Sequence, residues 1–368
     1  MPAKPPFRAD HVGSLLRSPE LIEAHTANLQ GRLPAEALRA LEDAAIADAI
    51  AMQERVGLDA VTDGELRRNN WRDRFFERVD GFSTHKVESS FIFTDYSGEQ
   101  RRGMPVPVVV GKLRRRASLT ADDFAFLRGR TKRTAKATIP APSANHFFSG
   151  DVSLKDSPYR DRKAFFADVT AIYREEVADL ARLGCTYLQI DEVPIAVLCD
   201  PKNQARVRER GEDPQSLIDD YIEAINDMVQ ERPPGMTVCL HLCRGNAGHG
   251  QASGGYDPVA ERLFQRTKVD GFFLEYDTER AGDFRPLRDL PKDKVAVLGI
   301  ISTKLRELEP IDAVKRRIEE ASRYADLDRL CLSPQCGFAS GYNTDRLTLA
   351  DQERKLAHMV KIANEVWT

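Results

Sequence analysis

The chain has 368 residues, of which 42% are hydrophobic and 30% charged, and its formal net charge is −3. This balance argues against a nucleic-acid-binding protein, which would be basic, and no stretch approaches the roughly 18 consecutive apolar residues of a membrane span. The N-terminal stretch MPAKPPFRADHVGS has no signal-peptide core, and six cysteines are too few for a disulfide framework, so a reducing cytoplasm is the expected location.

Strand-like segments recur along the chain, and most are separated by helical patterns. The first strand is predicted over FRADHVGS, which ends at Ser14. A helix follows over 35–56, where apolar side chains recur at three- and four-residue steps, and Gly57 ends it. The second strand is predicted over DAVTDGE and ends at Glu65.

The segment 71–130 departs from this alternation. FIFTDY and MPVPVVVGKL are predicted to be two strands of an antiparallel excursion, and LTADDFAFLRG a short helix with Thr120 as its N-cap. The basic run 112–116 is interpreted as a solvated face, with a pocket for an anionic substrate tail as the alternative.

Strands and helices alternate again in the rest of the chain. Strands three to eight are predicted over AKATIPAPS, TYLQIDEV, MTVCLHLC, VDGFFLEYD, KVAVLGIIS and LDRLCLSPQ, and helices over 160–183, 214–231 and 347–366 and from about 258 and 310. This order predicts an α/β fold, namely a (β/α)8 TIM barrel. We expect a single domain over residues 1–368, with 71–130 inserted after strand two. An open doubly wound sheet is disfavoured, because no G-x-G-x-x-G turn follows an early strand.

Polar side chains gather at the predicted carboxyl ends of these strands, where barrel enzymes have their active sites. His241 and Cys243 are two apart in the fifth strand and so point to the same side. Glu275 ends the sixth strand, and Cys336 follows the eighth. One imidazole, two thiolates and one carboxylate suit zinc better than magnesium or calcium. The alternative is a core cysteine beside a hydrogen-bonded histidine.

Six motifs carry a resemblance to a known family. VGSLLR, DGELRRNNW, LQIDE, HLCRGN, FLEYD and LSPQCGF occur in the order seen in the catalytic barrel of cobalamin-independent methionine synthase. The chain resembles the short, single-barrel relatives of that enzyme. The resemblance implies a zinc-dependent methyltransferase that converts homocysteine into methionine at the expense of a methyl donor, with zinc held by His241, Cys243, Glu275 and Cys336.

The resemblance also implies roles for residues around the metal. Glu65 and Asp191 would hold the ammonium group of homocysteine, and Gly13 and Ser14 would lie against its carboxylate. Where the family has a proton-donating histidine after the seventh strand, this chain has ISTK, which makes Lys304 the nearest catalytic candidate. His146 stands where an aromatic platform for folate is expected. Both departures leave the methyl donor open.

Three other functions compete with this interpretation. A transferase acting on another thiol, like the epoxide-opening coenzyme M transferases, would need cations where Glu65 and Asp191 supply negative charge. A zinc hydrolase would typically show H-x-H and an open position for water. A purely structural zinc site would usually show compact C-x-x-C pairs. The sequence does not decide between a monomer and a homodimer.

Overall fold

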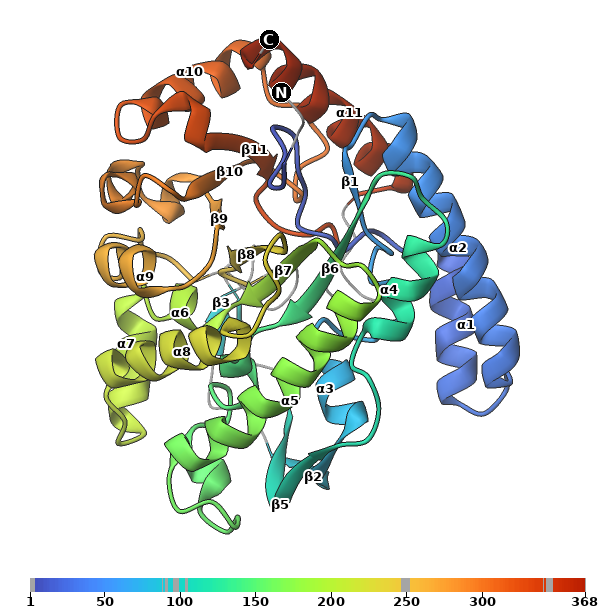
Figure 1. Cartoon of the computed structure of the whole chain (residues 1–368), viewed down its shortest axis with the longest axis vertical. Helices are drawn as coiled ribbons and strands as arrows, with labels where there is room; N and C mark the ends of the chain where they lie inside the picture. The colour runs from blue at the N-terminus through green and yellow to red at the C-terminus, as the bar shows by residue number, and fades with distance from the viewer. Residues whose placement is uncertain are drawn as a thin grey trace.

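The computed structural model describes residues 4–87, 89, 92–94, 99–102, 105–245, 252–339, 341 and 347–367. Within them, seven parallel strands form one curled sheet in the order β1-β6-β7-β8-β9-β10-β11 (Figure 1). These strands are β1 (Ala60–Val61), β6 (Thr134–Pro140), β7 (Tyr187–Glu192), β8 (Thr237–Leu242), β9 (Gly271–Glu275), β10 (Val295–Ile301) and β11 (Leu330–Pro334). Because neighbouring strands run parallel, their carboxyl ends lie along one edge of the sheet.

Helices surround the outer side of the curled sheet (Figure 1). They are α1 (Pro19–Leu29), α2 (Ala35–Arg55), α3 (Asp73–Arg78), α4 (Ala121–Arg128), α5 (Arg162–Arg182), α6 (Pro194–Val197), α7 (Pro201–Glu209), α8 (Pro214–Val229), α9 (Ala260–Arg266), α10 (Ile311–Ser322) and α11 (Leu349–Val366). Short 3-10 turns are η1 (Pro142–Asn145), η2 (Asp151–Leu154), η3 (Glu279–Ala281), η4 (Arg285–Asp289) and η5 (Leu327–Arg329). None of the helices in the described ranges combines the length and the apolar character needed to cross a bilayer.

The long helices start and pack as their sequences predict. The side chain of Asp161 accepts a hydrogen bond from the Ala164 amide at the start of α5, which satisfies one of the free N–H groups of that helix end. At α11, Thr348 and Asp351 form a reciprocal capping box. The strands of the sheet are almost continuously buried, because helices cover one face and the interior of the curl the other.

The first predicted strand is the one place where the parallel pattern fails. The segment 7–14 forms a single parallel bridge, between Ala9 and Leu332, and is otherwise irregular. The Asp10 carboxylate accepts hydrogen bonds from the Phe7 and His11 amides, so these groups are not available to a strand ladder. The regular sheet of the described residues therefore has seven strands instead of the eight expected.

The predicted antiparallel excursion is present between β1 and β6, but its pairing differs from the expected one. β5 (Val106–Arg115) pairs with β2 (Val79–Val87), a strand that the sequence analysis missed. The described residues of FIFTDY form β3 (Ile92–Thr94), which pairs with β4 (Gln100–Arg102). Cross-strand pairing depends on side-chain contacts between distant residues, so the choice of partner is not visible in the local pattern.

His11 lies in the buried core of the sheet, where a charged imidazole is unfavourable. Burial, and secondarily the charge of Lys136, lowers the pKa of His11 from 6.5 to about 4. Because the unfolded chain binds this proton at a higher pH than the folded chain, the contribution to stability is complete above pH 6.5 and is lost as the pH falls towards 4. We expect a loss of about 3 kcal/mol over that range.

Chemical denaturation between pH 7 and pH 4 measures this effect. The His11→Gln variant should show a shallower fall in unfolding free energy than the wild type over this range, whatever its stability at pH 7. The matched control is His85→Gln, at an exposed position on β2. An unchanged slope in His11→Gln would show that other groups cause the acid sensitivity.

Candidate metal centre and substrate site

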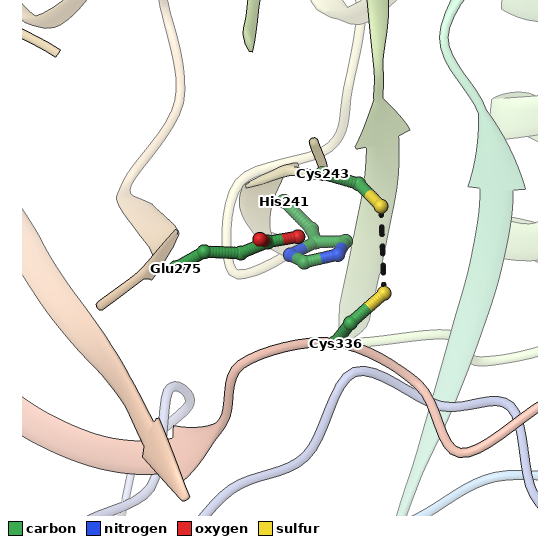
Figure 2. A group of neighbouring side chains, drawn as sticks. All are labelled: His241, Cys243, Glu275 and Cys336. Atoms are coloured by element: carbon green, nitrogen blue, oxygen red, sulfur yellow. Dashed lines mark hydrogen bonds between the residues drawn. The ribbon is translucent and has the colours of Figure 1, made fainter. Parts of the chain in front are cut away.

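The four predicted metal ligands come together at the carboxyl edge of the sheet. His241 lies in β8, Cys243 directly follows that strand, Glu275 is the last residue of β9, and Cys336 follows β11. All four are at least 93% buried. One ligand atom from each lies within 4.8 Å of the others, and Figure 2 shows the four side chains converging on one point.

The chemistry of this cluster fits a metal ion. The Sγ atoms of Cys243 and Cys336 are 3.4 Å apart (Figure 2). Neither ring nitrogen of His241 has a hydrogen-bond partner within the described part of the chain. A buried imidazole is rarely left without any partner, whereas a metal ion would occupy one nitrogen. The mixture of nitrogen, sulfur and oxygen donors suits zinc.

The surroundings of Cys336 favour the thiolate form of its side chain. The hydrogen bond with Cys243, opposed by burial and assisted by His241, lowers the pKa of Cys336 to about 5. The same hydrogen bond, together with burial, raises the pKa of Cys243. Without a metal ion, such a pair of thiols shares one proton between the two sulfurs, and a bound cation displaces that proton.

Glu275 is held by two groups that the sequence analysis did not identify. The backbone N–H of Arg244 donates to its Oε1 at 3.0 Å, and the guanidinium of Arg280 donates to its Oε2 at 2.9 Å. A carboxylate has about four lone-pair positions, so these bonds orient it and leave capacity for a metal. Arg280 lies in η3, in a stretch rich in acidic and basic residues, where no sequence signal distinguishes it.

Glu65 and Asp191 both lie buried at the same edge: Asp191 is near the end of β7, whereas Glu65 follows β1 by four residues, because the predicted second strand is regular only over Ala60–Val61. Glu65 accepts a hydrogen bond from the Thr138 hydroxyl at 2.9 Å, and Arg68 lies 3.6 Å from its other oxygen. Gln189 donates to Asp191 at 2.7 Å. Burial, followed by the charge of Glu65, raises the pKa of Asp191 to about 7, and burial also raises the pKa of Glu65. Ionising both carboxyl groups is costly, because their negative charges repel each other. The site therefore favours a positively charged ligand, which relieves this repulsion.

The backbone of Glu65 is in an unusual conformation. Its φ is +58°, and it is the only described non-glycine residue with a positive φ. A residue other than glycine is destabilised by about 1 kcal/mol or more in this left-handed region of positive φ. The strain is tolerated because the Glu65 amide donates to Asp63 at 2.9 Å and its side chain is fixed by Thr138. Such strain is typical of functional residues.

Gly13 and Ser14 lie close to these acids and to the Cys336 turn. A Cβ atom on Gly13, whose φ is +132°, would approach Thr138 to 2.7 Å and Glu65 Oε1 to 3.7 Å. The Phe338 amide donates to the Ser14 carbonyl at 2.9 Å. The irregular first segment therefore lies against both the buried acids and the turn that carries Cys336.

Gly337 is the residue on which this contact depends. A Cβ atom there would lie 1.8 Å from Ser14 Oγ, so Gly337→Ala must displace either Ser14 or the turn that carries Cys336. We expect a loss of about 1–3 kcal/mol in unfolding free energy and weaker metal retention. The control is Gly129→Ala, at an exposed position with φ −71° where no atom lies nearer than 3.5 Å to the added Cβ; metal content and denaturation curves provide the comparison. Wild-type behaviour of both variants would contradict the packing argument.

Lys304 and His146, the two residues at which the chain departs from the family pattern, lie in different surroundings. Lys304 lies in the loop after β10, is 8% exposed, and its Nζ has no hydrogen-bond partner among the described residues. His146 is fully buried, and its two ring nitrogens contact Tyr221 Oη and Asp151 Oδ1, each at 2.9 Å. His146 is therefore part of the packing of the loop after β6 and does not present an open face on which a ring could stack.

His146, Asp151 and Glu212 also form a second group of potential ligand atoms within 4.8 Å of one another. Arg162 already binds Asp151 at 3.0 Å and lies 3.7 Å from Glu212. The positive charge that this group needs is supplied by the protein. We interpret it as an ion-pair network that fixes the loop, and not as a metal site.

Known proteins match the chain over nearly its whole length. The model of the cobalamin-independent synthase catalytic domain matches residues 7–365. The Bacillus subtilis protein YxjH is 41% identical over 367 residues, which is 99% of this chain and 96% of YxjH. A Listeria monocytogenes structure described as a vitamin B12-independent methionine synthase superposes with a TM-score of 0.77 and 33% identity, covering 99% of this chain and 98% of that one.

A third comparison concerns the fold alone. A B12-independent methionine synthase from Shewanella, solved in complex with selenomethionine, has a TM-score of 0.75 at 21% identity and covers 98% of this chain and 97% of its own. The Shewanella likeness supports the fold alone. The curled parallel sheet and the Listeria superposition define the class as TIM-barrel-like α/β proteins of the methionine synthase type.

The chain belongs to the family of cobalamin-independent synthase catalytic domains. Membership implies a methyltransferase of the methionine synthase kind.

Proposed function

We propose that the chain is a zinc-dependent thiol methyltransferase that methylates homocysteine to form methionine. The observation that carries this proposal is the convergence of His241, Cys243, Glu275 and Cys336 at the carboxyl edge of the sheet, with Glu65 and Asp191 buried at the same edge. When bound, zinc lowers the pKa of a thiol so that it is nucleophilic at neutral pH. The methyl–sulfur bond then forms as the methyl–donor bond breaks.

The amino-acid part of the substrate is assigned to residues of the first segment, β1 and β7. Glu65 and Asp191 would bind the α-ammonium, whose charge relieves the repulsion between the two carboxylates. Gly13 and Ser14 would lie along the α-carboxylate. The Shewanella structure contains selenomethionine, which has the same α-amino and α-carboxylate groups as methionine, so an amino-acid ligand is the natural choice for testing this assignment.

The same two acids argue against the main alternative. A transferase for coenzyme M would have to place a sulfonate near Glu65 and Asp191, where two negative charges would repel it. No described feature of the site favours that substrate. The methyl donor stays open, because the residues that differ from the family pattern, Lys304 and His146, are those expected to contact it.

The organisation of the chain around this site is also a proposal. We propose a single catalytic domain over residues 1–368, with 71–130 as an insertion. We also propose a complete barrel, in which the segment 7–14 adds an irregular strand beside β11 to the seven regular ones. All six cysteines of the chain are buried and free, which accords with a reducing compartment such as the cytoplasm.

Methionine formation from homocysteine tests the proposed function directly. The zinc-loaded protein is incubated with homocysteine or coenzyme M and with several methyl donors, and the S-methylated products are quantified by mass spectrometry. We expect turnover with homocysteine and little with coenzyme M. Turnover with coenzyme M alone, or no thiol-dependent turnover with any donor, would contradict the proposal.

A further inference from the structure

Lys304 is placed between the strands that carry two of the four predicted metal ligands. β10 pairs with β9, where Gly299 lies opposite Glu275, and with β11, where Ile301 lies opposite Pro334, two residues before Cys336. Lys304 follows β10 by three residues. Its loop is held against the turn that carries Cys336, because the Thr303 amide donates to Gln335 Oε1 at 2.7 Å, and within the loop the Lys304 amide donates to Ser302 Oγ at 3.1 Å.

The side chain of Lys304 is buried beside this cluster without a hydrogen bond. It is 8% exposed, and its Nζ has no hydrogen-bond partner in the part of the chain that the structure describes. Burial lowers the pKa of Lys304, and the nearby Cys336, Cys243 and Glu275 act in the opposite direction. A buried ammonium without a partner destabilises the fold, so a role in the reaction is the more economical explanation of its presence.

The effect of an ammonium group at Lys304 on methyl transfer follows from the charges of the metal site and of the methyl donor. Two thiolates and one carboxylate around a divalent ion sum to −1, and a bound substrate thiolate adds another negative charge. When the methyl group comes from a neutral donor, the leaving group gains negative charge, and a nearby ammonium stabilises the transition state. When it comes from a sulfonium, the donor arrives positively charged and is repelled by the same ammonium.

We propose that Lys304 selects the methyl donor by charge, favouring neutral donors whose leaving group gains electron density and disfavouring cationic donors such as sulfonium compounds. This inference rests on the proposed function, because it concerns the second substrate of that reaction. It assigns Lys304 the role of a specificity-determining residue, and it narrows the donor class even though the donor itself is open.

Two simple reagents test this selection without knowledge of the natural donor. Zinc-loaded protein with bound homocysteine is treated with methyl iodide or with trimethylsulfonium. In both reactions a carbon–sulfur bond to homocysteine forms and the thiol proton passes to the buffer; iodide leaves in the first and dimethyl sulfide in the second. Methionine formation is measured above the rate in free solution, and the ratio of the two rate constants is compared between variants.

The expected result is a change in this ratio that follows the charge at residue 304. Lys304→Met removes the charge at similar length and should lower the ratio of methyl iodide to sulfonium rates about tenfold. Lys304→Arg keeps the charge and should leave the ratio close to that of the wild type. Lys292→Met, at an exposed position before the opposite end of β10, controls for the loss of one lysine.

A binding measurement provides a readout that does not depend on turnover. Calorimetry compares the affinity for methionine with that for S-methylmethionine, which carries a positive charge at sulfur. The wild type should bind S-methylmethionine about tenfold more weakly than methionine, and Lys304→Met should narrow this difference. The metal content of each variant is measured as a control, to check that the four predicted ligands still bind zinc.

The possible failures are distinct. If wild type and Lys304→Met form methionine with the same ratio of rate constants and the same ligand preference, Lys304 does not select by charge and the inference is wrong, while the proposed function stands. If bound homocysteine gives no methionine above the free-solution rate with either reagent, the proposed function and the inference both fall, because the cation then has no reaction to influence.

Discussion

Replacing Cys336 with serine is expected to remove most of the bound zinc and to abolish methyl transfer. A serine hydroxyl is a harder and much weaker ligand for zinc than a thiolate, and the change also removes the partner that lies 3.4 Å from Cys243. We expect metal affinity to fall by at least about 100-fold. Elemental analysis of the purified protein gives the metal content, and methionine formation gives the activity.

The matched control for this variant is Cys331→Ser. Cys331 lies on β11, the strand that leads to Cys336, and is similarly buried, but its sulfur donates to the Pro6 carbonyl at 3.7 Å and is not one of the four grouped ligand atoms. This variant should retain the metal and lose only stability. Full metal occupancy in Cys336→Ser, or equal metal loss in both variants, would contradict the assignment of Cys336 as a ligand.

Asp191→Asn is the second change with a large expected effect, and it should act on the recognition of the amino group. An amide keeps the shape of the side chain but loses the charge that would face the α-ammonium. Truncating one partner of a buried charge pair costs about 2–5 kcal/mol. We therefore expect a fall of roughly 100-fold in kcat/KM for homocysteine, with KM carrying most of it, while metal content stays unchanged.

A substrate without the amino group makes this test specific. 4-Mercaptobutyrate has the thiol and the carboxylate of homocysteine but no ammonium, so wild type and Asp191→Asn should use it with similar efficiency. Glu65→Gln should behave in the same way, because Glu65 is assigned to the same group. If Asp191→Asn impairs both thiols equally, the residue acts on the fold or on the metal and not on the ammonium.

The stability of this variant provides an independent check. Burial and Glu65 raise the pKa of Asp191 to about 7, so ionisation of this group opposes folding in the absence of a bound cation. Without substrate, Asp191→Asn should therefore be at least as stable as the wild type at pH 8, where the wild-type carboxyl is largely ionised. Saturating methionine should stabilise the wild type more than the variant.

Several features of this protein follow from local sequence alone. Parallel strands end at one edge of the sheet, so the residues at the ends of the apolar runs were expected to meet: His241, Cys243, Glu275 and Cys336. This expectation depends only on chain order and on the alternation of side chains along a strand. The long helices and predicted strands three to eight are confirmed because their hydrophobic patterns are strong, whereas the predicted second strand is regular only over Ala60–Val61.

Other features depend on contacts between distant parts of the chain. The segment 7–14 looks like a strand, but the Asp10 carboxylate takes the amides that a strand would need. β5 pairs with β2, and not with the FIFTDY segment, because register is set by the facing strand. Arg280 holds Glu275 although it looks like an ordinary surface residue in the sequence, and the local sequence does not indicate that Lys304 is buried without a hydrogen bond among the described residues.

Local sequence is enough to predict which chemical groups this protein brings to the carboxyl edge, since strand order and alternation are local properties of the chain. The charge and the orientation of those groups depend instead on the folded arrangement. Burial, the pairing of Glu275 with Arg280 and the closeness of Glu65 to Asp191 arise from residues far apart in sequence. The electrostatic energy of a site depends on such distances and on exclusion of water, and neither is encoded in any single stretch of the chain.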